Sequence, residues 1–244
     1  MGELIAVLSG KGGTGKTSVC AGIAVALALS GKQVLCIDCD VGLRNLDIAL
    51  GLSDTTALSF PEVAEGRYPL EDALVHPVYP RLRFLTAPVN CTSADIDGDA
   101  FHRMLAEARE RFDYILMDAP AGIEEGFSLT AEAADRILLV TGPDPAAIRD
   151  AARTGEVLER LGKTDVRLIV NRITRRLASA LNLTVDDIMD AAGLPLIGLV
   201  PEDPNVTLAA TYRQPLLGFT RRGAAAACRR IAKRVQGRSV PVRI

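Results

Sequence analysis

Short apolar runs alternate with longer segments of helical periodicity along the whole chain. Many of the runs are apolar on both faces, which is typical of buried parallel strands. They lie at residues 4–8, 33–37, 82–86, 114–117, 137–141, 166–170 and 196–200. Helical segments between them include residues 16–30, 99–111 and 146–161. The pattern predicts one α/β domain over residues 1–244, with a mostly parallel sheet and helices on both faces.

The composition agrees with a folded domain of this class. The chain has 244 residues, of which 48% are hydrophobic and 4% aromatic, with a formal net charge of −2. That length supplies enough apolar mass for a core without disulfides or metals, and the low net charge excludes disorder. The longest apolar-dominated run, residues 19–29, is shorter than the ~20 residues of a membrane span. We therefore expect a cytoplasmic protein.

Basic residues gather toward the C-terminus. Nine of the 28 Lys and Arg residues lie in residues 213–244, where there is no acid, and the other 19 face 30 acids. Residues 221–236 are predicted to form a basic helix within the domain, with a narrow apolar face that suits docking on the protein's own sheet. This face contains Ala224, Cys228, Ile231 and Val235. The basic side is suited to an anionic partner or to the acidic body of the chain.

A glycine-rich loop follows the first predicted strand and opens the first helix. Its sequence, GKGGTGKT, matches the phosphate-binding pattern G-x-x-x-x-G-K-[ST] in the expected context. Backbone N–H groups and the helix N-terminus would surround a polyphosphate, with Lys16 on the β- and γ-phosphates and Thr17 on Mg²⁺. The loop consists of Gly10, Lys11, Gly12, Gly13, Thr14, Gly15, Lys16 and Thr17. The guanine-reading sequence N-K-x-D is absent, so ATP is favoured over GTP.

Three carboxylates end two of the predicted strands. Asp118 ends an apolar strand, as the aspartate that holds Mg²⁺ through water does in phosphate-loop enzymes. Asp38 and Asp40 end another strand and are separated by one residue, so they share a face. We expect both to face the same metal and water.

Lys11 makes the loop unusual, because a second lysine directly after the first glycine marks the deviant Walker A group. Together with IDCDVGLRNLD at residues 37–47 and DYILMDAPAGIE at residues 113–124, the loop resembles the MinD/ParA family of dimerising ATPases. The resemblance runs over residues 2–243. Residues 42–47 and 119–123 resemble the MinD branch rather than the ParA branch.

The resemblance implies roles for single residues. Lys11 would cross an ATP-sandwiched dimer interface and act with Lys16 and Asp40 as the catalytic set, in which Asp40 positions the attacking water. Asp38 would support the Mg²⁺ shell beside Thr17 and Asp118. Residues 40–47 would form switch I, and residues 118–124 switch II.

An adenine site is implied by the same resemblance. Asn171 follows a strand and would hydrogen-bond the adenine, since an amide offers both a donor and an acceptor. Arg172 is next in the chain. Pro201 and Asp203 would supply backbone contacts from the other side of the base.

The resemblance further implies a slow, partner-stimulated ATP hydrolase that acts as a spatial switch in division-site placement. Its partners would be a second copy bound with ATP, a division inhibitor like MinC, and a stimulating or topological factor. In the family, the aligned C-terminal helix is followed by a membrane-targeting helix, which would begin about where this sequence stops. Three explanations are open: a subgroup without this helix, loss of the final residues, or weak contact of the basic tail itself with anionic lipid, which would place the protein at the inner face of the membrane. The first two are favoured.

Two other function classes fit the residues less well. A ParA-like nucleoid-binding or cargo-positioning ATPase is supported by the basic tail, but the acidic body and the switch residues make DNA a weaker partner. A metabolic ligase or an iron–sulfur carrier would need its own acid–base residues or a cysteine pair. Cys36 and Cys39 form the one C-x-x-C spacing and are expected to be packing residues. His76 and His102 are expected at the surface.

Overall fold

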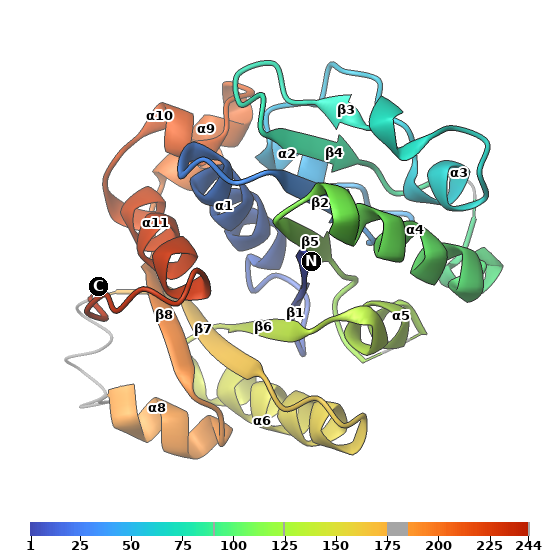
Figure 1. The fold of residues 1–244 in the computed structure, drawn as a ribbon. Coiled ribbons are helices and arrows are strands. Elements are labelled where there is room, and N and C mark those ends of the chain that lie inside the picture. Colours follow the sequence, from blue (N-terminus) through green and yellow to red (C-terminus); the bar gives the residue numbers. More distant parts are fainter. Residues whose placement is uncertain (90, 124, 175–184, 244) are drawn as a thin grey trace.

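A computed structural model describes residues 1–89, 91–123, 125–174 and 185–243 (Figure 1). Within these residues an eight-stranded sheet has the order β3-β4-β2-β5-β1-β6-β7-β8. All neighbouring strands are parallel except β3 and β4. The strands are β1 (Glu3–Leu8), β2 (Val34–Asp38), β3 (Leu74–Val75), β4 (Leu82–Leu85), β5 (Tyr114–Asp118), β6 (Arg136–Thr141), β7 (Val166–Ile173) and β8 (Leu196–Pro201). The predicted mostly parallel α/β fold is confirmed.

Helices cover both faces of the sheet and bury an apolar core on each side (Figure 1). One core contains residues of α1 (Lys16–Leu29), α2 (Leu46–Ala49), α9 (Asn205–Thr211), α10 (Leu216–Phe219) and α11 (Gly223–Val235). The other contains residues of α3 (Phe60–Ala64), α4 (Gly98–Arg111), α5 (Glu125–Ala133), α6 (Pro145–Arg160) and α8 (Val185–Ala192). Short 3₁₀ turns lie at η1 (Leu70–Asp72) and η2 (Ser93–Asp95).

The predicted strands lie within a few residues of the observed ones, but β3 was not foreseen. It has two residues and pairs antiparallel with β4 at the sheet edge, so it carries no periodicity that a sequence pattern could reveal. The apolar face predicted for the C-terminal helix is buried on the sheet, as expected. At Gly198 of β8 a side chain would overlap Ile231 of α11, so this helix lies directly on the strand.

Part of the basic side of α11 holds the chain's own backbone. Arg234 donates to the carbonyl oxygens of Ile197, Val240 and Pro241 at 2.6, 2.9 and 2.6 Å, and Arg230 donates to that of Arg243 at 2.9 Å. The segment that follows α11 therefore turns back along the helix. Among the described residues, no helix combines the length and apolar composition that crossing a bilayer requires.

The two C-x-x-C cysteines are packing residues, as expected. Cys36 lies in the core beneath α1 and Cys39 in the core on the other face, so the two thiols point away from each other. The sulfur of Cys36 is instead 4.0 Å from that of Cys20 on α1. All five cysteines are free.

The expectation that His76 lies at the surface is wrong, whereas His102 is exposed on α4. The His76 side chain is 2% exposed. Its Nε2 lies 2.9 Å from the carbonyl oxygen of Leu50, and its Nδ1 accepts from the N–H groups of Val78 and Tyr79 at 3.1 and 3.3 Å. A neutral imidazole can be buried here because the loop's backbone uses both of its nitrogens.

Acid is expected to weaken the fold through His76. Burial lowers its pKa below the usual 6.5, so below that pH the unfolded chain binds the proton more readily than the folded one. The stability contributed by His76 is therefore complete above about pH 6.5 and is lost as the pH falls toward the lowered pKa. As the pH falls, the difference in the free energy of unfolding between wild type and His76→Gln, measured in urea, should shrink by up to about 1.4 kcal/mol per pH unit. Parallel pH profiles of the two proteins would contradict this.

Candidate functional site

The predicted site residues meet at the carboxyl edge of the central strands. The glycine-rich loop follows β1, which lies next to β5, and β5 lies next to β2. Asp38 and Asp118 are register partners on β2 and β5, so the two carboxylates lie side by side. The parallel arrangement causes this meeting, because parallel strands all end at the same edge.

A buried ion pair joins the loop to β5. The Nζ of Lys16 is 2.6 Å from Oδ1 of Asp118, with exposed side-chain fractions of 6% and 1%. Burial tends to lower the pKa of Lys16, but the charge and hydrogen bond of Asp118 outweigh it and raise the pKa. Oδ2 of Asp118 is buried without a partner. An unpaired carboxylate oxygen is costly, and a cation or its bound water would satisfy it, so the site fits Mg²⁺.

Asp38 holds the main chain of the predicted switch I. Its Oδ1 accepts from the N–H of Asp40 at 3.0 Å, and its Oδ2 accepts from that of Leu46 at 3.1 Å. Burial and the charge of Asp118 raise the pKa of Asp38 to about 7. Asp40 is half-buried, and burial raises its pKa as well. The Asp38 carboxylate therefore fixes the backbone of the loop that carries Asp40.

Neighbouring elements shape the glycine-rich loop from behind. A Cβ at Gly10 would lie 2.5 Å from the Thr154 hydroxyl of α6, and one at Gly15 would overlap the Asn171 amide of β7. Gly13 and Gly15 have φ of 80° and 85°, which favours glycine. The outer rim, with Lys11, is exposed. The loop is therefore fixed on its inner side and open to solvent on its outer side, next to Thr17 at the start of α1.

Two hydroxyls at strand ends near the loop were missed by sequence reasoning. Among the described residues, Ser9 at the end of β1 and Thr141 at the end of β6 have buried side-chain oxygens without partners, as does Thr14 in the predicted loop. Serine and threonine are common at strand ends, so no pattern in the sequence marks these positions.

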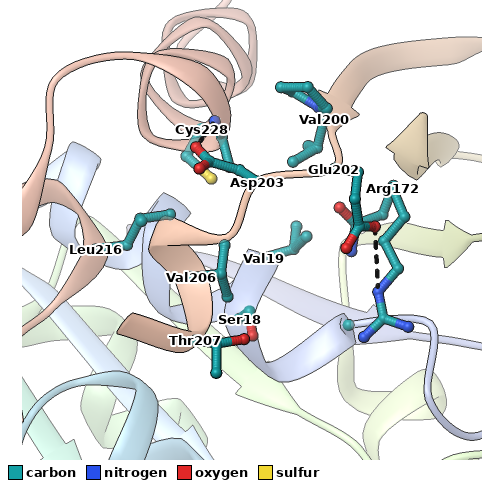
Figure 2. A pocket seen from close by; sticks show the side chains of 14 residues that line it. Ser18, Val19, Arg172, Val200, Glu202, Asp203, Val206, Thr207, Leu216 and Cys228 are labelled. Carbon is teal, nitrogen blue, oxygen red and sulfur yellow. Dashed lines mark hydrogen bonds and ion pairs between the residues drawn. The ribbon is translucent and has the colours of Figure 1, made fainter. Parts of the chain in front are cut away.

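A cavity of about 70 Å³ lies beside the loop, between the ends of β7 and β8 and the helices α1, α9, α10 and α11 (Figure 2). Its lining comprises Gly15, Ser18, Val19, Asn171, Arg172, Val200, Pro201, Glu202, Asp203, Val206, Thr207, Leu216, Ala224 and Cys228. All four predicted adenine-site residues are among them. Asn171 donates to the carbonyl oxygen of Thr14 at 2.8 Å, which ties the cavity to the phosphate loop.

Charged side chains lie on the exposed side of this cavity. Arg172 has φ of 59° and lies 3.9 Å from Glu202 (Figure 2). Both carboxylate oxygens of Asp203 already accept hydrogen bonds within the protein. Oδ1 accepts from the backbone N–H and side-chain amide of Asn205, and Oδ2 accepts from the N–H of Ala224. Its carboxylate holds the first turns of α9 and α11, and its carbonyl oxygen accepts from the N–H of Val206 at 3.1 Å. Glu124, the last residue of the predicted switch II, lies outside the described residues.

Known proteins share both the sequence and the fold. Residues 5–216 match the family described as "CobQ/CobB/MinD/ParA nucleotide binding domain". The septum site-determining protein MinD of Bacillus subtilis (strain 168) is 36% identical over 248 aligned residues, which cover 100% of this chain and 92% of that protein.

Two solved structures extend the likeness to three dimensions. One is the MinC:MinD cell division protein complex of Aquifex aeolicus, with a TM-score of 0.91, 36% identity and 99% coverage of both chains. The other is the septum site-determining protein MinD of Pyrococcus horikoshii OT3, complexed with Mg-ADP. It has a TM-score of 0.84 and 29% identity, and the match covers 96% of each chain.

The close approach at Gly10 gives a stability test. Gly10→Ala should destabilise the protein by about 1–3 kcal/mol, because its methyl would meet the Thr154 hydroxyl and the Asp150 carbonyl of a packed helix. Gly12→Ala is the matched control, because the nearest atom to its methyl is the Cβ of Ala121 at 4.0 Å. Urea unfolding without nucleotide measures both variants. Equal stability of the two would show that α6 does not constrain the loop.

Proposed function

Because the chain belongs to the MinD group of the CobQ/CobB/MinD/ParA nucleotide-binding family, we propose that it is an ATP-driven switch in division-site placement. It binds ATP with Mg²⁺, pairs with a second copy, and is reset by hydrolysis to ADP and phosphate. The observation that carries the proposal is the meeting of Lys16, Asp38 and Asp118 behind the phosphate loop, with one oxygen of Asp118 unpaired.

The loop and the carboxylates divide the work on the phosphates. The N–H groups of residues 10–17 and the Lys16 ammonium hold the triphosphate, while the Thr17 hydroxyl and the Asp118 carboxylate hold Mg²⁺, the latter through water. Mg²⁺ neutralises phosphate charge when bound. Asp38 supports this shell and keeps the switch loop closed through its two backbone contacts. Asp40, on that loop, orients the water that attacks the γ-phosphate.

Adenine is read in the cavity beside the loop. Asn171 presents its amide there, and Arg172, Pro201 and the backbone of Asp203 line the rest. The Mg-ADP complex of the Pyrococcus horikoshii relative supports a purine nucleotide as the ligand of this site.

A second copy completes the active state. Lys11 is exposed on the rim of the loop, where it reaches the nucleotide held by the facing subunit. Such a dimer presents one surface to a division inhibitor like MinC, in keeping with the MinC:MinD complex of the Aquifex aeolicus relative. Hydrolysis is slow until a stimulating or topological factor binds the dimer. Loss of the γ-phosphate then relaxes residues 40–47 and 118–124 and separates the copies.

Removing the Asp40 carboxylate separates binding from hydrolysis. Asp40→Ala should bind ATP normally, hydrolyse it about 10²–10⁴-fold more slowly and accumulate as a dimer with ATP. Phosphate release and light scattering after size exclusion measure the two effects. Asp99→Ala, on the exposed face of α4, is the control and should match wild type. Adding Lys11→Ala to Asp40→Ala should return the protein to a monomer, and a persistent dimer would exclude the Lys11 role.

The trapped dimer also tests where the switch acts. The bases of residues 213–243 that the fold leaves free contact anionic lipid at about 1 kcal/mol per base, and dimerisation doubles that contact. Asp40→Ala should therefore sediment with anionic liposomes in ATP and not in ADP. An ATP-dependent shift of duplex DNA without lipid binding would instead favour a ParA-like nucleoid-bound ATPase. If the trapped dimer binds neither lipid nor DNA, a partner sets its location.

A further inference from the structure

Two arginines of α11 have no acidic partner among the described residues. Arg230 and Arg234 are one turn apart, so their guanidinium groups share one side of the helix. Both donate only to carbonyl oxygens, and residues 213–244 contain no acid. Burial and the nearby charge of Arg230 lower the pKa of Arg234. Two like charges at this spacing repel each other, so this side of α11 favours an anion.

Neutral carbonyl oxygens take the place of an anion at these arginines. Residues 240–243, which we call the strap, lie back along α11. Arg234 donates through Nε and Nη2 to the first two strap carbonyls at 2.9 and 2.6 Å, and Arg230 donates to the last one at 2.9 Å. The Nη1 of Arg234 donates to the carbonyl oxygen of Ile197 on β8 at 2.6 Å. A phosphate oxygen carries a charge that a carbonyl oxygen lacks, so a phosphate can take these donors from the strap.

The strap has little else to hold it. Among the described residues, every hydrogen bond that joins the strap to another part of the chain comes from these two arginines. Val240 is half-buried, and Val242 is 41% exposed. The strap is a short, mostly apolar sequence, Val-Pro-Val-Arg, beside the exposed bases Lys233 and Arg238. Apolar residues flanked by bases suit an anionic membrane surface better than nucleic acid, because a bilayer also accepts apolar side chains.

We propose that Arg230 and Arg234 exchange the strap for the phosphate groups of anionic lipids, so that contact with a membrane releases residues 240–243 into the boundary between headgroups and acyl chains. The proposal rests on the lipid contact proposed above, which uses bases that the fold leaves free. It adds two bases that the fold holds in solution, and a conformational step that frees them. The bond from Arg234 to Ile197 persists in this step, because Nη1 faces β8 and makes no contact with the strap.

A single tryptophan can report the position of the strap, since the sequence contains none. Val242→Trp introduces it, and its fluorescence anisotropy is measured in solution without nucleotide. Adding Arg230→Gln and Arg234→Gln should lower the anisotropy, because the strap loses its hydrogen bonds. Arg81→Gln with Arg103→Gln, which removes two exposed bases outside α11, is the matched control and should leave the anisotropy unchanged. Equal anisotropy in the two pairs of variants would show that the arginines of α11 do not hold the strap.

Vesicles test the exchange itself. The tryptophan is placed in the Asp40→Ala protein with ATP, and its quenching by brominated phosphatidylcholine, which acts only near contact, is followed with and without phosphatidylglycerol. Quenching should appear only in the anionic vesicles, because the strap reaches the bilayer after a lipid phosphate replaces it. Replacing Arg230 and Arg234 by Gln should weaken vesicle binding at least about tenfold, and the control pair should weaken it less than about threefold. Equal weakening by both pairs would mean that the bases act only through their overall charge, which overturns the proposal.

Three further outcomes separate this proposal from the function on which it rests. If the protein sediments with anionic vesicles but the tryptophan is not quenched, the strap stays on α11 and this proposal alone is overturned. If the protein does not sediment at all, the lipid contact proposed above fails as well. If inorganic phosphate at matched ionic strength, or duplex DNA, lowers the anisotropy and vesicles do not, the arginines serve a free anion or a nucleic acid, and the proposal of a lipid partner is overturned.

Discussion

The buried ion pair between Lys16 and Asp118 is the contact on which the arrangement of the site depends. A buried charge without a partner costs several kcal/mol, so Lys16 and Asp118 must each have one. Within the protein the two charges pair with each other, while Oδ2 of Asp118 has no partner. In the proposed function, the phosphates would attract Lys16 and a cation would take its place at Asp118. Nucleotide binding would then exchange partners among buried charges without creating a new unpaired charge.

The same edge of the sheet controls the switch loop. Asp38 lies beside Asp118 and is joined to residues 40 and 46 by backbone hydrogen bonds. In the proposed function, a change in the charges around Asp118 would alter the interactions of Asp38 and, through its two backbone contacts, the position of the loop that carries Asp40. Because protein interiors are closely packed, such a loop changes between discrete positions rather than deforming gradually. The contacts of Asp38 would thus link bound phosphates to residues 40–47.

The far end of the chain is part of the same unit. Helix α11 packs on β8 and α1, and Asp203 holds its start beside the cavity next to the phosphate loop. Arg230 and Arg234, which a sequence pattern assigns to a basic surface, donate to carbonyl oxygens of the protein itself. Part of the tail's charge is consequently structural, and fewer bases are left for lipid or nucleic acid than their number in the sequence indicates.

Contiguous residues determined the fold class and the phosphate loop. Apolar runs mark parallel strands, and glycines, lysine and threonine at fixed spacing mark the loop, because these signals depend on neighbours in the chain. Only the tertiary structure decided that His76 is buried, that Cys36 faces Cys20 rather than Cys39, that Asp38 closes the switch loop, and that Cys228 lines the cavity. Each of these depends on contacts between residues brought together by the register of parallel strands and by the docking of helices. A linear pattern carries no record of such distances, because packing in three dimensions sets them.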